Sequence, residues 1–334
     1  MKSMLKRLLT LALAAVMVLT VAACGGSSSS ASESGSGSAP AGETASLKMG
    51  TGGTTGTYYA FGGVVSQVLA SKVEGLSFDV QSTGASKANI YLIADGDADI
   101  AIVQNDVMDY AYNGTDLFEG EKVEGFSTMA AAYAEVCQII ADPSITSIED
   151  LKGKRVSVGD VGSGVEFNAR QILAAYGISF DDIVVNNLSF GDSATAYKDG
   201  KIDAFFCTAG APTTAVTELT TTNPINVLEI DDEHAAALIA EHPFYTQYAI
   251  PANTYKGVEE EKMTVAVKAT FIVSDNLSED LVYNMTKALF ENVDEITVGH
   301  AKGAELDPAY AVAGISVPFH PGAEKYFKEV GVLQ

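Results

Sequence analysis

The stretch LKMGTGGTTG, residues 47–56, decides the fold, because its pattern occurs again as RVSVGDVGSG at residues 155–164. In each copy a short apolar strand runs into a glycine-rich loop. Apolar residues at helical spacing follow each loop, from Phe61 to Leu69 in the first copy and from Phe167 to Leu173 in the second. A repeated strand–loop–helix unit predicts two α/β lobes rather than one.

The repetition continues further along the chain. The segments at 95–101 and 199–205 each place a glycine where a helix ends and a short apolar strand begins. These strands lead into Gln104-Asn105-Asp106 and into residues 208–212. The shared order predicts a mainly parallel sheet in each lobe. Because ligands of such sheets lie beyond the carboxyl ends of the strands, we expect both glycine-rich loops to line one cleft.

Downstream of the repeat, residues 264–273 are predicted to form a strand, and residues 281–293 and 321–329 are predicted to form helices.

The N-terminus has the pattern of a secretory signal. Lys2, Lys6 and Arg7 precede an apolar run of 12 residues, 8–19, shorter than the roughly 20 that span a bilayer. Residues 1–23 are therefore predicted to be a signal peptide. Val21-Ala22-Ala23-Cys24 resembles the lipobox of bacterial lipoproteins, which implies that Cys24 is acylated and becomes the first residue of the mature chain. The alternative is an ordinary signal peptide with an incidental cysteine.

The segment after Cys24 is rich in glycine and serine. Residues 25–46 contain no aromatic or large aliphatic side chain, so they cannot bury enough apolar surface to fold. We expect residues 24–46 to form a lipid-anchored, disordered tether.

The net charge limits the classes of partner, and the cysteine content limits the cross-links. The chain has 43 acidic and 20 basic residues, three of them in the signal. So acidic a chain argues against nucleic acid and against direct binding to anionic lipid. Cys137 and Cys207 are either one disulfide, which an oxidising compartment permits, or two buried free thiols.

Both glycine-rich loops lead into helix N-termini, where free N–H groups and the helix dipole favour a carboxylate or phosphate. Thr54, Thr57 and Ser163 can add hydroxyl donors, and Ser86 can cap the helix after the loop at 83–86. The alternative is that these residues make only caps and tight turns. After the signal the chain has just two arginines, Arg155 and Arg170, and neither is placed for a bidentate clamp on an anion.

Enzymatic patterns are weak. The loop at 50–55 has Thr55 where a dinucleotide fingerprint has its third glycine, and no lysine makes it a phosphate loop. The four histidines lack metal-ligand spacing: His234, His242, His300 and His320. Among so many acidic residues, a pair of catalytic carboxylates of the glycosidase kind stays an open alternative. We expect a binding protein with no catalytic residues, metal or cofactor.

With these motifs in order, the chain resembles the TAXI family, the solute receptors of one branch of the tripartite (TRAP) transporters. The resemblance covers nearly all of the chain after the tether. It rests on the segments TGGTTGTYY (51–59), TGAS (83–86) with Asn89, DIAIVQND (99–106), YAE (133–135), DLKGKR (150–155), GSG (162–164), IPANTY (250–255) and PFHPGA (318–323).

The resemblance implies a periplasmic-binding-protein fold (type II-like) with two crossovers, near Glu135 and Ile250. Lobe 1 is then 47–135 with 250–334, and lobe 2 is 136–249. It also implies a monomeric receptor that captures glutamate, glutamine or a related dicarboxylate by lobe closure. The partner implied is a permease with large and small membrane components.

Position by position, the resemblance implies twelve ligand contacts. Glu135 would lie on a hinge strand, and an acid in an anion site favours a ligand that carries an ammonium group; the alternative is that Glu135 only ties the hinge together. Ala85 and Val165 depart from the glycine and threonine common in relatives. The twelve are Thr54, Thr57, Tyr58, Thr83, Ser86, Asn89, Gln104, Glu135, Ser163, Gly164, Thr208 and Gly210.

Other functions remain open at this stage. A receptor of the same fold can serve an ATP-driven importer or a sensor, because the partner is encoded elsewhere. A surface lipoprotein without a transport role is a third reading.

Overall fold

The computed structural model describes residues 44–334. The predicted signal peptide, Cys24 and the tether up to residue 43 lie outside the described residues. The first strand, β1 (Ala45–Gly50), begins inside the range assigned to the tether, because Ala45 and Ser46 pair with Leu76 and Ser77 of β2 (Leu76–Gln81). Within residues 44–334 no helix combines the length and apolarity needed to cross a membrane.

The fold class is the predicted one, a two-lobed α/β architecture. Ten strands join in one mixed sheet in the order β2-β1-β3-β10-β4-β7-β5-β6, with β8 on β4 and β9 on β10. Each lobe contributes three parallel strands: β1, β2 and β3 (Ile100–Gln104) in lobe 1, and β5 (Arg155–Ser157), β6 (Val184–Asn186) and β7 (Ala204–Ala209) in lobe 2. The predicted repeat is therefore a structural repeat, in which each triplet lies beside one antiparallel strand.

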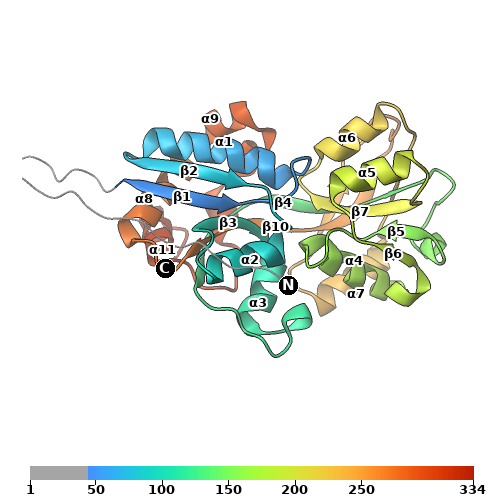
Figure 1. The fold of residues 1–334 in the computed structure, drawn as a ribbon, viewed down its shortest axis with the longest axis horizontal. Coiled ribbons are helices and arrows are strands. Elements are labelled where there is room, and N and C mark those ends of the chain that lie inside the picture. The colour runs from blue at the N-terminus through green and yellow to red at the C-terminus, as the bar shows by residue number, and fades with distance from the viewer. Residues whose placement is uncertain (1–43) are drawn as a thin grey trace, which may run out of the picture. The chain divides into compact units, whose positions relative to one another are not determined.

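Two long strands connect the lobes. β4 (Phe126–Ala141) and β10 (Lys262–Ser274) pair antiparallel and run through both lobes (Figure 1). The second half of β10 pairs with β3, and its first half pairs with β9 (Thr246–Ile250). The first half of β4 pairs with β10, and its second half pairs with β7 and β8 (Asn226–Leu228). Glu135 and Val267 are paired where the strands change lobe.

This pairing favours a second lobe boundary after Ile250. Ile250, Tyr255 and Val258 share a core cluster with Phe205 of β7, and β9 pairs with Lys262–Ala266 of β10. Residues 251–266, which the sequence analysis assigned to lobe 1, thus pack with lobe 2. We propose 44–134 with 268–334 as lobe 1 and 136–266 as lobe 2.

Helices cover the sheet of each lobe. Lobe 1 has α1 (Thr57–Lys72), α2 (Ser86–Ala94), α3 (Asn105–Asn113), α8 (Glu279–Glu291), α9 (Val293–Gly299), α10 (Pro308–Val312) and α11 (Pro321–Glu329). Lobe 2 has α4 (Gly164–Ala175), α5 (Phe190–Lys198), α6 (Thr214–Thr220) and α7 (Asp232–Glu241). Short 3-10 turns are η1 (Asp116–Phe118), η2 (Glu149–Leu151), η3 (Phe180–Asp182) and η4 (Ala301–Glu305).

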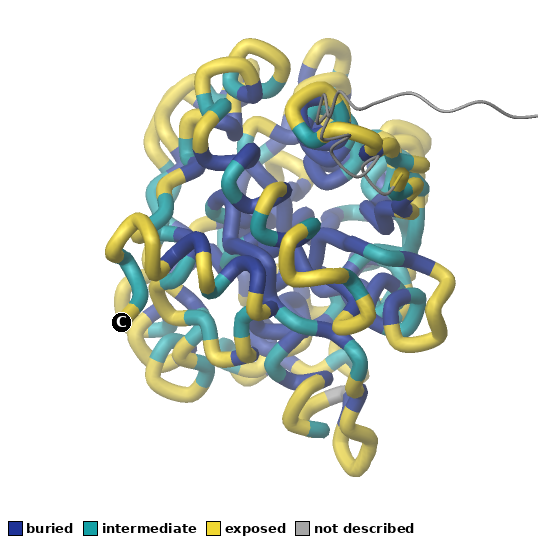
Figure 2. Tube along the Cα trace, turned by 90° about the vertical axis from the view of Figure 1, so that its left-hand side faces the viewer, coloured by how far each residue is buried: buried dark blue, intermediate teal, exposed yellow. Residues whose placement is uncertain are grey.

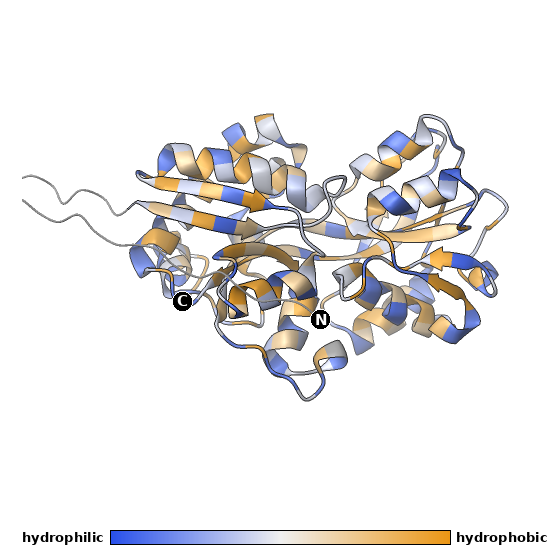
Figure 3. Cartoon of the chain, in the orientation of Figure 1, coloured by the Kyte–Doolittle hydropathy of each residue, from blue (hydrophilic) through white to orange (hydrophobic). Residues whose placement is uncertain are grey.

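Local sequence explains several of these ends. Asp231 caps α7 by accepting from the N–H groups of Glu233 and His234, and α11 begins with a proline, Pro321, in its first turn. Hydrophobic residues dominate β3 and β7, whereas β1, β2 and the helices carry hydrophilic residues as well (Figure 3). Buried residues accordingly run through the sheet and exposed ones lie on outer loops and helix faces (Figure 2).

Candidate ligand-binding cleft

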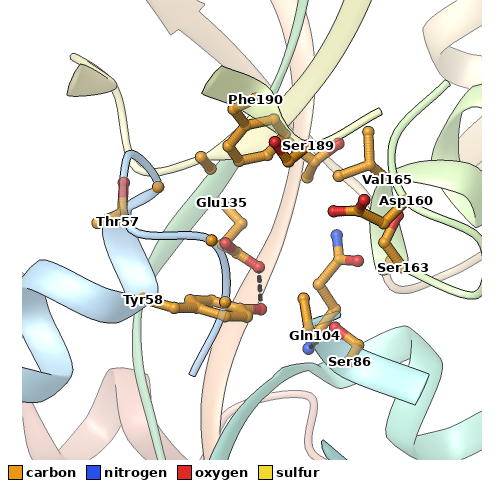
Figure 4. Close-up of a pocket in the computed structure, with 17 residues that line it drawn as sticks. Thr57, Tyr58, Ser86, Gln104, Glu135, Asp160, Ser163, Val165, Ser189 and Phe190 are labelled. Carbon is orange, nitrogen blue, oxygen red and sulfur yellow. Dashed lines mark hydrogen bonds between the residues drawn. The ribbon is translucent and has the colours of Figure 1, made fainter. Parts of the chain in front are cut away.

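The cleft lies between the lobes, at the carboxyl ends of β1, β3, β5 and β7. With the lobes closed the cavity is small, and about 40 Å³ of it can hold the centre of a water-sized sphere. Four helices, α1, α2, α4 and α5, begin at its walls (Figure 4). The walls are Gly52, Gly53, Gly56, Thr57, Tyr58, Ala85, Ser86, Gln104, Glu135, Asp160, Ser163, Gly164, Val165, Ser189, Phe190, Thr208 and Ala209.

The two lobes touch around this cavity. Thr57 Oγ1 donates to Gly210 O at 3.0 Å, and Lys87 N donates to Gly162 O at 3.3 Å. Gln104 Nε2 crosses the cleft and donates to Asn168 Oδ1 at 2.6 Å. Each bond joins a lobe 1 group to a lobe 2 group, so the structure shows a closed arrangement.

A buried hydrogen-bond network behind the cleft also joins the lobes. Asn168 of α4 donates through Nδ2 to Asp106 Oδ2 at 3.1 Å and to the Tyr245 hydroxyl at 2.7 Å. Tyr245 donates to Gln171 Oε1 at 2.7 Å, and Gln171 Nε2 donates to the Tyr110 hydroxyl at 3.0 Å. Since Asp106 and Tyr110 belong to lobe 1, this network is formed only when the lobes are together.

Helix N-termini give the cleft its donors. The N-cap of α1 is Gly56, which supplies no side-chain cap, and its Thr57 and Tyr58 line the cavity. At α4 the Ser163 hydroxyl accepts from Glu166 N at 3.3 Å, while Gly164 and Val165 face the cavity. The first N–H groups of a helix have no acceptor inside the helix, so these ends suit a carboxylate or another anion.

Glu135 is the most buried charge in the cleft. Glu135 is only 2% exposed, and its Oε2 accepts a hydrogen bond from the Tyr58 hydroxyl at 2.5 Å. Burial raises the pKa of Glu135 well above its usual range, and Asp106 adds to the rise, while the Tyr58 hydrogen bond and Lys302 oppose it. Burial, together with Glu135, likewise raises the pKa of the Tyr58 hydroxyl. The ionised form of Glu135 therefore needs a positive partner.

Three buried polar atoms lack a hydrogen-bond partner within the described residues: Gln104 Oε1, Asp106 Oδ1 and the Tyr133 hydroxyl. Burial raises the pKa of Asp106 to about 7, against the opposing effect of the N–H of Val107 and of Asn168. Gln104 lies on the cavity wall, and its unpaired Oε1 is buried against Gly164.

Eight of the twelve sequence-predicted contacts line the cavity: Thr57, Tyr58, Ser86, Gln104, Glu135, Ser163, Gly164 and Thr208. Their role as ligand contacts stays a prediction.

Three of the other four have structural contacts instead. Asn89 donates to the carbonyls of Thr51 and Ile102 at 2.7 and 2.8 Å, and Thr83 donates to Thr51 O at 2.8 Å. These bonds tie the first glycine-rich loop to the strand ends. Thr54 is exposed, and the carbonyl of Gly210 accepts the bond from Thr57 described above.

Sequence reasoning missed three polar or aromatic side chains that line the cavity. Asp160 lies in the second glycine-rich loop, and Ser189 and Phe190 form the turn into α5. The strand–turn–helix β6–α5 repeats the β2–α2 unit of lobe 1, so extending the internal repeat by one more unit could have found Ser189 and Phe190.

Several other expectations can be compared with the structure. The arginines lie outside the cavity wall: Arg155 pairs with Asp203 at 2.5 Å and Arg170 with Glu166 at 3.4 Å. Cys137 and Cys207 are buried free thiols. Ala85 has a φ of 66°, a conformation that favours glycine, which gives a physical reason for the glycine expected there in relatives.

The fold and the cleft together define a class, the two-lobed α/β binding proteins that hold a small ligand between hinged lobes. More particularly, the chain belongs to the NMT1-like family, whose model matches residues 49–331. Membership of the TAXI family stays a prediction.

Solved structures share this fold at low identity. The alkanesulfonate-binding protein SsuA from Xanthomonas axonopodis pv. citri matches with a TM-score of 0.50 at 15% identity, over 87% of this chain and 92% of that one. PhnD1 from Prochlorococcus marinus, in complex with methylphosphonate, matches with a TM-score of 0.54 at 10% identity, over 85% and 95%. At such identities these similarities show the fold.

Proposed function

We propose that this chain is an extracytoplasmic receptor that captures an amino acid by closing its two lobes and delivers it to a membrane permease. The observation that carries the proposal is Glu135. Its carboxylate is buried in the cleft, and within residues 44–334 no lysine, arginine or histidine lines the cavity. Lys302 is the cation that acts on Glu135, but it is paired with Glu305 at 2.6 Å. A buried carboxylate with so little compensating charge is costly, so a ligand ammonium group is the natural partner.

The other end of an amino acid fits the helix N-termini. The starts of α1 and α4 present N–H groups from opposite lobes, and a carboxylate between them would be held by both. The similar structures bear names or ligands of anions, a sulfonate and a phosphonate. Glutamate, glutamine and simple dicarboxylates all suit this end, but only the amino acids also supply the ammonium group that Glu135 needs.

Capture needs no covalent step. A ligand that touches both lobes stabilises the closed state over the open one. The permease would then recognise the closed receptor. We propose a TRAP permease as the partner and lipidation at Cys24 as the membrane anchor; an ATP-driven importer is the alternative partner. A neighbouring gene for a many-helix permease without an ATPase supports the first, and a neighbouring ATPase gene supports the second.

Titration calorimetry on the full chain, unfolded and refolded to remove any co-purified ligand, tests the proposal. Glutamate and 2-oxoglutarate form a matched pair, because the two differ in the ammonium group that Glu135 is proposed to bind. Glutamate should bind tighter, and Glu135→Gln should weaken amino-acid binding by roughly 30-fold or more, since breaking a buried charge pair costs about 2–5 kcal/mol.

Glu218→Gln, at an exposed position of α6, serves as the control and should change nothing. Equal affinity for 2-oxoglutarate and glutamate would remove the ammonium argument. No binding of any of the common amino acids would remove the amino-acid receptor itself, and native mass spectrometry of the chain before refolding would then identify what the cleft carries.

A further inference from the structure

We infer that Asp160 makes this cleft selective for amino acids with a positively charged side chain, an inference that rests on the proposed function. Glu135 and Asp160 reach the cavity from different parts of the molecule. Glu135 comes from the hinge strand β4, and Asp160 from the loop between β5 and α4 in lobe 2 (Figure 4). One α-ammonium group placed at Glu135 therefore leaves Asp160 for another group of the ligand.

Asp160 differs from the acidic residues around it. Glu166 accepts from Gly162 N at 2.6 Å and pairs with Arg170, and Asp192 accepts from the Ser189 hydroxyl at 2.7 Å. The carboxylate of Asp160 has neither a hydrogen-bond donor nor an ion-pair partner within the described residues, although it is half-buried in the cavity wall. Its oxygens point toward the cavity (Figure 4).

A second and independent observation concerns Gln104. This residue of lobe 1 is 2% exposed and lines the same cavity, and its Oε1, which is buried against Gly164, has no partner among residues 44–334. A buried acceptor without a donor is costly. The cavity thus presents two carboxylates beside a buried amide oxygen, and a ligand that satisfies both carboxylates must bring donors at more than one point.

The charges around Asp160 disfavour a ligand whose side chain is acidic. Burial, together with the nearby Asp192, raises the pKa of Asp160, which means that its surroundings supply no compensating positive charge. A second ligand carboxylate near Asp160 would add like-charge repulsion, whereas an ammonium or guanidinium group would relieve it. Phe190, Val165 and Tyr58 supply apolar wall for the aliphatic stem of such a side chain.

The test compares ligands that differ in side-chain charge on the refolded full chain. Lysine, arginine and ornithine are the positive probes, glutamine is the neutral one and glutamate the negative one, each titrated into the unmodified chain and into three variants. Asp160→Asn should weaken the positive probes about 10- to 100-fold and leave glutamine within a few-fold. Glu135→Gln should weaken all amino acids alike, because it acts on the group that they share.

Asp181→Asn is the matched control. It removes an exposed carboxylate of the same lobe that does not line the cavity, so it should not change the ratio of lysine to glutamine affinity.

Glutamate or glutamine binding tighter than every positive probe would overturn the inference and leave the amino-acid receptor standing. An Asp160→Asn variant with an unchanged lysine-to-glutamine ratio would overturn it as well. If no amino acid binds the unmodified chain, the proposed function fails and the inference fails with it.

Discussion

Asp106 offers a sharp test of the closed structure, because it is a buried acid whose charge is poorly compensated. It is fully buried at the start of α3, one carboxylate oxygen accepts from Asn168 of the other lobe, and the second oxygen has no partner within the described residues. Replacing it with asparagine keeps the shape and removes the charge. The variant should therefore be stabilised at high pH relative to the unmodified chain.

The magnitude follows from the pKa. Burial raises the pKa of Asp106 from 3.8 to about 7. An acid with a raised folded-state pKa binds more protons in the native than in the unfolded state, so stability falls as pH rises from about 4 to about 7 and is level above that. Between pH 5 and pH 8 the free energy of unfolding therefore falls by about two pKa units' worth, or about 3 kcal/mol. Asp106→Asn abolishes this part of the pH dependence.

The assay is urea unfolding at pH 5 and pH 8, followed by circular dichroism because the chain has no tryptophan. The variant should gain up to about 3 kcal/mol over the unmodified chain on going from pH 5 to pH 8. Glu135, whose pKa is raised in part by Asp106, remains in both proteins, so the difference between them reports on Asp106 together with its effect on Glu135. A variant that gains nothing at pH 8 relative to pH 5 would refute the reasoning.

Asp203→Asn is the control with the opposite sign. Hydrogen bonds from Arg155 lower the pKa of Asp203, so its contribution to stability is present above the unfolded-state pKa and lost as pH falls below about 4. Its replacement should destabilise the chain equally at pH 5 and pH 8.

Three shorter predictions concern the cleft. A Cβ at Gly164 would lie 1.1 Å from Gln104 Oε1, so Gly164→Ala should push the Gln104 side chain aside, break its interlobe bond to Asn168 and weaken closure, which a larger radius of gyration of the ligand-loaded chain in X-ray scattering would show. Tyr58→Phe removes the hydroxyl that donates to the hinge carboxylate and should weaken amino-acid binding about 10- to 100-fold in calorimetry; an unchanged affinity would mean that this bond plays no part. Replacing both Arg155 and Arg170 by glutamine should leave the affinity for the same amino acid within a few-fold, and a complete loss would show that an arginine acts on the ligand.

The sequence predicted the architecture because the repeat is encoded in short-range patterns. The strand, glycine-rich loop and amphipathic helix at 47–69 and 155–173 each depend on local periodicity, and the structure has β1, α1, β5 and α4 there. The second lobe boundary could not be read in this way. The sequence predicted a strand at 264–273, which corresponds to β10. The pairing of the first half of β10 with β9 is a contact between distant segments, and residue composition does not predict it.

The site was harder to predict because polar residues near a cleft have two competing uses. Asn89 and Thr83 have the chemistry of ligand contacts, yet the structure uses both to satisfy backbone carbonyls where β1 and β3 end. Such buried carbonyls need donors, and a sequence does not reveal which side chain will supply them. Asp160 was overlooked for the opposite reason, since an acid in a glycine-rich loop is usually a solvated turn residue.

The same groups that select a ligand can also couple closure to its capture. Closing the lobes around an empty cavity buries Glu135 and the unpaired oxygen of Gln104 together with Asp160, and each unmet acceptor costs about 1–3 kcal/mol. The interlobe bonds of Thr57 and Asn168 offset part of this cost but supply no positive charge. A ligand that brings donors removes the penalty only in the closed state, and that difference in affinity between the two states is what shifts the population. The closed state would then form mainly when a ligand of the right charge fills the cleft, so a permease that binds the closed state would bind the loaded receptor.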